Sequence, residues 1–173
     1  MTEYRRPSLL DPSLHDRSQF VCAETAYADW LKRFAGQSRR GDTAATWVIA
    51  DSDYRVVAYA TLSMTGIDLS KAPAQIAKRA PDPVPALLIG RLAVDQHHEG
   101  LGIGTELVKH ILATALELNE SAAFRAVVVT ALNDVARRWW GERLGFEPFN
   151  PDDPENFDMY LLTSTIAATL ETR

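Results

Sequence analysis

The chain has 173 residues, of which 46% are hydrophobic, and a formal net charge of −5. That length is enough for one domain with a sizeable core, and the negative charge argues against a protein that coats nucleic acid through its overall charge. The single cysteine, Cys22, excludes an internal disulfide, and we expect a small core residue there rather than a reactive thiol. Without a membrane-spanning apolar run or a signal-peptide core, the sequence predicts a cytoplasmic protein with no membrane partner.

The first part of the chain predicts a helix after a polar, extended segment, residues 1–20. Residues 24–36 form this expected helix, which Gly36 ends, and a basic loop follows over 37–42. Three apolar residues at helical spacing mark its expected buried face: Ala26, Trp30 and Phe34.

The following segments predict a β-hairpin and a connector. Residues 46–50 and 55–65 have the composition of strands, and the polar residues 51–53 supply the turn between them. Residues 67–85 form the connector, with one short helix at about 75–79. Three prolines cannot continue a helix and deliver the chain in an extended form: Pro81, Pro83 and Pro85.

The second half of the chain alternates strands and helices. The expected elements are a strand 87–95, a helix 102–118, a strand 126–131, a helix 133–144, a strand from Phe146, an acidic loop 150–155 and a last strand 159–166. The helix 102–118 carries its apolar residues on one side: Ile103, Leu107, Val108, Ile111, Leu112, Ala115 and Leu118. This order predicts one mixed sheet flanked by helices, in a single domain over 1–173 with its core at about 10–166.

The segment between the strand 87–95 and the helix 102–118 is the most informative part of the chain. Gly100, Gly102 and Gly104 let the backbone bend tightly, so that successive N–H groups point at one place. The start of the helix adds its positive dipole end there. Glycines in isolation indicate only turns, but in this position they predict a site for a phosphate or pyrophosphate.

Two common phosphate motifs do not match this segment. A P-loop requires Gly-Lys-Ser/Thr, whereas Gly104 is followed by Thr105 and Glu106, so no lysine is available to a triphosphate. A dinucleotide site requires Gly-x-Gly-x-x-Gly in the first strand–helix unit and an acidic residue about 20 positions later. The glycines here follow another spacing, lie in the middle of the chain and lack that acidic residue.

The segment resembles the pyrophosphate loop of the GNAT N-acetyltransferases, whose pattern is Arg/Gln-x-x-Gly-x-Gly/Ala. His97 stands at the first position and departs from the pattern, while Gly100 and Gly102 match it. The resemblance implies acetyl-CoA as cofactor, phosphates bound by backbone N–H groups and by His97, and no metal. The residues implied to bind coenzyme A in this segment are Glu99, Gly100, Leu101, Gly102, Ile103, Gly104 and Thr105.

The same resemblance implies the GNAT fold over nearly the whole chain. That fold is an α/β (α+β) domain with a single mixed, mostly antiparallel, twisted sheet flanked by helices on both faces. The predicted order of helices and strands matches it.

Motifs before the glycine segment are similar to those of one branch of the family, the tRNA-acetylating toxins of bacterial type II toxin–antitoxin systems. The similar segments, within about residues 10–165, are Phe20-x-Cys22, Trp30-Leu31, the prolines of 81–85 and Ile89-Gly90-Arg91-Leu92-Ala93-Val94-Asp95. The resemblance implies an enzyme that acetylates the α-amino group of aminoacyl-tRNA and blocks translation. It also implies a ribbon–helix–helix antitoxin as partner and a homodimer.

The resemblance also implies where the acetyl group is held. It places the N–H donor to the thioester carbonyl in the strand, among Leu92, Ala93 and Val94, with the pantetheine along that strand and Asn133 hydrogen-bonded to it. Asn133 is equally suited to cap the following helix. An α-amino group has a pKa of roughly 7.7–8.0, so no dedicated carboxylate base is required.

One residue of the family's chemistry is missing. The family supplies its general acid from a tyrosine in the pattern Phe-Tyr-x-x-Leu/Phe-Gly-Phe, and in this chain Gly141 occupies that position beside Trp140. An indole N–H donates a hydrogen bond without supplying a proton, and the tryptophan also suits a core. Three explanations stay open: water protonates the thiolate, another side chain such as a different tyrosine or Glu142 replaces the phenol, or the chain binds coenzyme A and an antitoxin without catalysis. A small-molecule amine acetyltransferase is a further alternative.

Basic residues give candidates for tRNA contact. Arg91 stands out because it lies in an otherwise apolar strand and needs a partner or a cleft. The other candidates are Arg39, Arg40, Arg137 and Arg138, with Lys32, Arg33, Lys109 and Arg143 as weaker ones.

Overall fold

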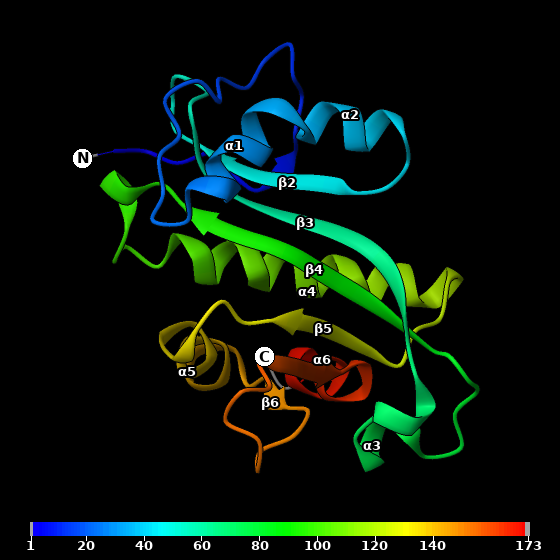
Figure 1. Cartoon of the computed structure of the whole chain (residues 1–173). Coiled ribbons are helices and arrows are strands. Elements are labelled where there is room, and N and C mark those ends of the chain that lie inside the picture. Colours follow the sequence, from blue (N-terminus) through cyan, green and yellow to red (C-terminus); the bar gives the residue numbers. More distant parts are fainter. Residues whose placement is uncertain (1, 172–173) are drawn as a thin grey trace. The chain divides into compact units, whose positions relative to one another are not determined.

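Strands and helices alternate in the computed structural model, which describes residues 2–171 (Figure 1). The strands of the described residues are β1 (Ser8–Leu9), β2 (Ala45–Ala50), β3 (Val56–Ile67), β4 (Val84–Val94), β5 (Ala126–Thr130), β6 (Glu147–Pro148) and β7 (Asp158–Leu162). They form a seven-stranded sheet in the order β1-β2-β3-β4-β5-β7-β6. The pairing of β4 with β5 is parallel, and those of β1 with β2, β2 with β3, β5 with β7 and β6 with β7 are antiparallel. The predicted mixed, mostly antiparallel sheet is therefore confirmed.

The α-helices are α1 (Thr25–Arg33), α2 (Ala35–Arg40), α3 (Ala74–Ala77), α4 (Ile103–Ser121), α5 (Asp134–Leu144) and α6 (Thr163–Glu171). Short 3-10 turns occupy Leu69–Lys71 and Gln96–His98. Within the described residues, no helix combines the length and the hydropathy that crossing a bilayer requires.

Contacts within the chain divide it into two compact units. The first contains residues 1–63 and 90–111, and the second contains residues 64–89 and 112–173. The expectation of one domain over 1–173 therefore stays a prediction.

In the first unit, α1 packs on the predicted hairpin of β2 and β3. Its core includes Phe20, Leu31, Ala35, Val48 and Tyr59. The hairpin is confirmed, with Trp47 paired to Ala60 across an antiparallel ladder. Cys22 is buried in the same cluster, where burial raises the pKa of its thiol, so the expectation of a core residue is confirmed.

Two expectations for the first helix were wrong. It ends at Arg33, and Gly36 lies inside α2, a second helix that covers most of the predicted loop 37–42. The buried face was also wrong, because Ala26 is exposed and Phe34 is 47% exposed. The core instead takes the smaller residues at the spacing i, i+3 and i+7: Ala28, Leu31 and Ala35. The largest apolar side chains of this segment therefore do not mark its buried face.

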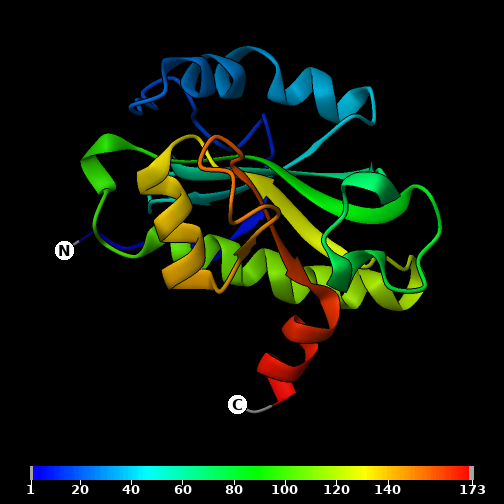
Figure 2. The same cartoon turned by 60° about the horizontal axis from the view of Figure 1, so that its bottom comes forward.

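In the second unit, β5 lies between β4 and β7. Ala86 pairs with Ala126 in the parallel ladder, and Val128 pairs with Tyr160 in the antiparallel one. The predicted last strand 159–166 was wrong beyond Leu162, because α6 begins at Thr163 (Figure 2). The Thr163 side chain and N–H donate to the carbonyls of Phe124 and Arg125, which ends the ladder and starts the helix.

The helix α4 confirms the predicted amphipathic pattern along most of its length. Ile103, Leu107, Ile111 and Ala115 are buried, as expected of one apolar side. Leu118 is 37% exposed, because the buried side ends at Ala115, nearly two turns before the end of the helix at Ser121.

Candidate active site

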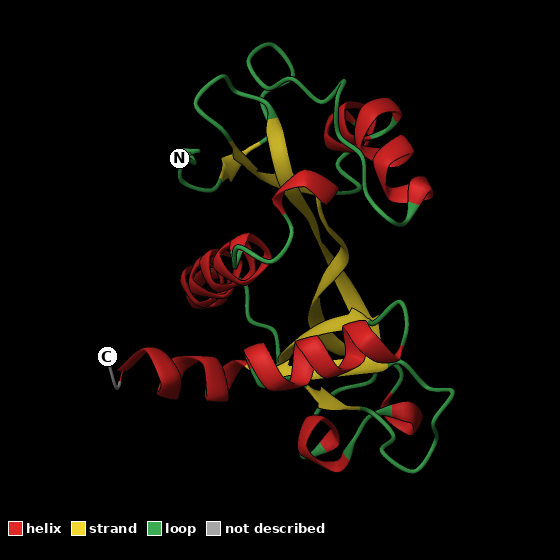
Figure 3. Cartoon of the chain, turned by 90° about the vertical axis from the view of Figure 1, so that its left-hand side faces the viewer, coloured by secondary structure: helices red, strands yellow, loops and turns green. Residues whose placement is uncertain are grey.

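The glycine segment adopts the predicted conformation. After β4, Gln96–His98 form a 3-10 turn, and a short loop leads from it into α4 (Figure 3). Gly100 and Gly102 lie in this loop. Their φ angles are 76° and 79°, in the left-handed region that favours glycine. A Cβ atom added at either residue meets no atom within 4 Å. The outer side of this loop is therefore open, and its backbone is accessible to an anion. Gly104 lies in the first turn of α4.

A buried carboxylate, Asp95, holds the loop in place. Its Oδ1 accepts the backbone N–H of His97 at 2.9 Å, and its Oδ2 accepts that of Val21 at 3.0 Å. Burial acts to raise the pKa of Asp95, but these hydrogen bonds outweigh it and keep the pKa below the ordinary value. The ionised carboxylate thus ties the end of β4 to the segment before α1. Sequence reasoning did not single out this role of Asp95.

His97, at the family's Arg/Gln position, is oriented by the same carboxylate. Its Nδ1 lies 3.0 Å from Oδ1 of Asp95, while 71% of its side chain is exposed. Because an ionised carboxylate only accepts hydrogen bonds, Nδ1 carries the proton and Nε2 points away from Asp95. Nε2 then donates to a phosphate oxygen only when the ring is protonated.

A second contact holds the loop from the start of the chain. The Tyr4 hydroxyl lies 2.8 Å from Nδ1 of His98, and the two rings meet edge to face. Tyr4 and His98 are 94 positions apart. No local pattern signals such a distant pair, so the sequence did not predict it.

Arg91 finds the partner that an arginine in an apolar strand needs. Its guanidinium carbon lies 4.3 Å from the ring centroid of Trp30 in α1, and the Trp30 ring stacks on Tyr59 of β3. The Tyr59 hydroxyl donates to the carbonyl of Tyr27 at 2.7 Å. The stack of Arg91, Trp30 and Tyr59 keeps the positive charge of Arg91 on the side of β4 that faces α1.

In the second unit, Asn133 acts as the expected helix cap. Its Oδ1 accepts the N–H of Ala136 at 2.9 Å, and its backbone is extended immediately before α5. Asn133 is exposed, and the contact of its side-chain N–H₂ group with pantetheine stays a prediction.

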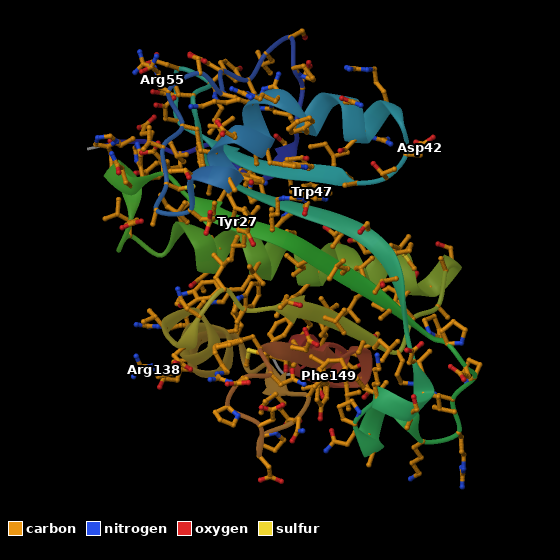
Figure 4. The ribbon with its side chains drawn as sticks, viewed as in Figure 1. Tyr27, Asp42, Trp47, Arg55, Arg138 and Phe149 are labelled. Carbon is orange, nitrogen blue, oxygen red and sulfur yellow. The ribbon has the colours of Figure 1, made fainter. Side chains whose placement is uncertain are left out.

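The candidate tRNA arginines differ in how far they are engaged within the chain. The Arg137 guanidinium donates to the carbonyls of Pro154 and Asn156, contacts Asp134 and covers the ring of Phe157. It therefore holds the acidic loop against α5. Arg138 is exposed (Figure 4). In the first unit, Arg40 is exposed and Arg39 makes a weak, exposed ion pair with Asp42.

The structure brings together only part of the predicted site in each unit. The first unit joins Arg91, the strand residues Leu92 to Val94 and the glycine loop, and the second unit holds Asn133, the arginines of α5 and Gly141. Within the described residues, no group of three or more His, Cys, Asp or Glu side chains is arranged to hold a metal ion.

Comparison with known proteins decides the family. The model of the acetyltransferase (GNAT) family matches residues 10–146, most of the chain. The chain belongs to this family. As an acetyltransferase, it is 30% identical over 154 residues to the tRNA-acetylating toxin of Mycobacterium tuberculosis (strain ATCC 25618 / H37Rv), covering 89% of this chain and 90% of the relative. It is 23% identical over 126 residues to a probable toxin TacT of Sinorhizobium fredii (strain NBRC 101917 / NGR234), covering 71% of this chain and 70% of the relative.

Solved structures agree on the GNAT fold of this acetyltransferase. AtaT in complex with acetyl-methionyl-tRNAfMet superposes with a TM-score of 0.86 at 21% identity, covering 97% of this chain and 99% of AtaT. A tyrosine-to-phenylalanine mutant of KacT gives a TM-score of 0.84 at 24% identity, covering 95% of this chain and 99% of KacT. Identities this low support the fold alone.

The residue at which this acetyltransferase departs from the family pattern, Gly141, lies inside a regular helix. Gly141 lies within α5, and the helix continues to Leu144 before Gly145 ends it with a φ of 76°. The neighbouring Trp140 is buried, and its ring meets Trp139 and Phe146 edge to face. Trp140 is thus a core residue of the second unit, and that Gly141 stands at the position of the family's tyrosine stays a prediction.

Replacing Gly141 with alanine is expected to stabilise the acetyltransferase. A Cβ added there meets Phe146 O at 3.6 Å and Met159 Cε at 4.0 Å, which are ordinary contacts. Alanine is favoured over glycine inside a helix, so the free energy of unfolding rises by about 0.5–1 kcal/mol. Urea denaturation of the Gly141→Ala variant measures this change, and a loss of stability would show that α5 has no room for a side chain.

Proposed function

We propose that this protein is an acetyl-CoA-dependent N-acetyltransferase that acetylates the α-amino group of aminoacyl-tRNA and thereby blocks translation, as a toxin. The single observation that carries the proposal is the similarity to a tRNA-acetylating toxin over 89% of the chain. The family match over residues 10–146 supports the transfer of an acetyl group. The acetyl-methionyl-tRNA bound by AtaT supports the class of acceptor.

The glycine loop binds the pyrophosphate of acetyl-CoA in this proposal. The open backbone at Gly100 and Gly102 suits an anion, and the N–H groups from Glu99 to Thr105 lie at the N-terminus of α4. His97 adds a donor when its ring is protonated. A complex of AtaT and AtaR has been solved with acetyl-CoA bound, which supports the same ligand here.

The remaining roles fall to β4 and α5. Acetyl-CoA supplies a thioester whose carbonyl needs a hydrogen-bond donor and whose sulfur leaves as a thiolate. In the proposal a backbone N–H among Leu92, Ala93 and Val94 donates to that carbonyl, and Asn133 holds the pantetheine. The acceptor is an α-amine with a pKa of roughly 7.7–8.0, so a useful fraction is neutral without a base. Arg91, Arg39, Arg40 and the arginines of α5 are the proposed contacts with tRNA.

One observation favours a second candidate. Gly141 leaves the tyrosine position without a hydroxyl, which is the change expected of a relative that binds coenzyme A and an antitoxin but no longer catalyses. We rank the enzyme first, because general-acid help is typically worth about 10²–10⁴-fold and a thiol with a pKa near 8.5 leaves without it.

We also propose an antitoxin as the protein partner. AtaT has been solved with the C-terminus of the antitoxin AtaR, and a KacTA complex has been solved with DNA. For this chain the proposed partner is a ribbon–helix–helix antitoxin, and the proposed assembly is a homodimer. The proposed place of action is the cytoplasm, where charged tRNA is found.

Acceptor competition tests the proposal. The protein is incubated with labelled acetyl-CoA and, in separate reactions, with bulk charged tRNA, the same tRNA after deacylation, and free amino acids. Label in the charged tRNA alone is the expected result. Label in the free amino acids indicates a small-molecule acetyltransferase, and no label with coenzyme A still bound supports the binding-only candidate.

A further inference from the structure

The tyrosine hydroxyls differ in whether the fold gives them a hydrogen-bond partner. The chain has five tyrosines. Tyr4 bonds to His98, the Tyr59 hydroxyl donates to a carbonyl, the Tyr160 hydroxyl donates to Glu147, and the Tyr54 ring lies under the Arg5 guanidinium. The hydroxyls of Tyr27 and Tyr54 have no hydrogen-bond partner within residues 2–171. Of these two, only Tyr27 packs against the core cluster that contains Ala93 of β4, so its hydroxyl is available to a ligand beside that strand.

Tyr27 is placed beside the strand that carries the proposed carbonyl donor. It lies in α1, is half-buried, and packs against the core cluster in which Ala93 of β4 is buried. Trp30, one turn further along α1, lies under Arg91. Arg91 and Ala93 share one face of β4, because alternate residues of a strand point to the same side. Figure 4 shows Tyr27 on the side of α1 that faces β4.

Two opposing influences act on the pKa of the Tyr27 hydroxyl. Burial raises the pKa of Tyr27, while the positive charge of Arg91 acts against that increase. At neutral pH the phenol therefore has a proton to give, and the guanidinium nearby stabilises the phenolate that remains.

We propose that the Tyr27 hydroxyl is the proton donor to the leaving thiolate, the role that the family pattern gives to a tyrosine at the position of Gly141. The inference rests on the proposed function. A bond forms between the amine nitrogen and the acetyl carbon, the carbon–sulfur bond breaks, and its electron pair stays on sulfur. Tyr27 gives its proton to that sulfur, and the proton lost by the amine returns to the phenolate through solvent.

The test compares four full-length proteins: wild type, Tyr27→Phe, Gly141→Tyr and the double variant. Each is assayed with acetyl-CoA and bulk charged tRNA, and acetyl-CoA affinity is measured by calorimetry. We expect Tyr27→Phe to lower kcat by about 10²–10⁴-fold with unchanged affinity for acetyl-CoA. The gain in kcat from Gly141→Tyr is expected to be about tenfold larger in the Tyr27→Phe background than in the wild type. The reason is that the Tyr27→Phe protein lacks the donor hydroxyl, whereas the wild type already has it.

The control is Tyr54→Phe, which removes a hydroxyl and keeps the ring under Arg5; its kcat is expected to equal that of wild type. An unchanged kcat in Tyr27→Phe overturns the proposal. A loss of kcat that is matched by a loss of acetyl-CoA affinity also overturns it. The same holds if Gly141→Tyr raises kcat equally in the wild-type and Tyr27→Phe backgrounds, or in neither. A wild type without transfer activity instead contradicts the proposed function.

Discussion

Replacing Gly102 with alanine is expected to weaken coenzyme A binding by about tenfold or more. Two costs combine in this variant. The φ of 79° disfavours any residue with a Cβ, by about 1–2 kcal/mol, so the loop relaxes away from its present conformation. The added methyl group also occupies the open space above the backbone, where the proposed pyrophosphate approaches. Calorimetric titration with coenzyme A measures the loss.

Gly145 provides a matched control for this prediction. It has a φ of 76°, a Cβ added there meets nothing within 4 Å, and it ends α5 rather than lying in the glycine loop. Gly145→Ala is therefore expected to lose similar stability and to keep its coenzyme A affinity. Equal affinity losses in both variants, or none in Gly102→Ala, would mean that the glycine loop is not the pyrophosphate site.

Replacing Asp95 with alanine is expected to lower the free energy of unfolding by about 2–4 kcal/mol. Asp95 is only 6% exposed, and its carboxylate accepts the backbone N–H groups of Val21 and His97, which lose their acceptor in the variant. Chemical denaturation measures the change. Asp29→Ala, an exposed acidic residue of α1, is the control and is expected to stay within about 0.5 kcal/mol of wild type.

The Asp95 prediction has a pH dependence of known sign. The pKa of Asp95 in the folded protein lies below its ordinary value, so the carboxylate stabilises the fold at neutral pH. That contribution is fully present above the ordinary carboxylate range and is lost as pH falls through the folded-state pKa. The difference in stability between wild type and Asp95→Ala is thus expected to shrink as pH falls below about 4. A difference that stays the same from about pH 5 down to about pH 2 contradicts the assigned hydrogen bonds.

Most elements of the fold follow from local patterns of sequence. The hairpin turn at 51–53, the amphipathic helix α4 and the β-branched strand β5 each contain their own signal, and each lies where the pattern predicts. The errors arise where tertiary contacts decide. Thr163 is compatible with a strand, and its hydrogen bond to the carbonyl of Phe124 is what starts α6.

In the candidate site too, features set by local sequence were predictable, and features set by tertiary contacts were not. A tight turn with positive φ was predictable at Gly100 and Gly102, and the need of Arg91 for a partner was predictable from its apolar strand. The identity of that partner, Trp30, depends on how α1 packs on β4, which no local pattern encodes. The contact between Tyr4 and His98 and the anchoring of His97 by Asp95 depend on the folded chain in the same way.

In the proposed function, this protein transfers an acetyl group to charged tRNA with Gly141 of α5 at the position that the family pattern gives to a tyrosine. A single-turnover reaction tests it most directly, with the protein in excess over bulk charged tRNA and saturated with acetyl-CoA. The amino acids are then released by mild alkali and identified by mass spectrometry. We expect amino acids acetylated on the α-nitrogen, at a yield limited by the amount of tRNA. Unmodified amino acids in a reaction where acetyl-CoA is bound would contradict it.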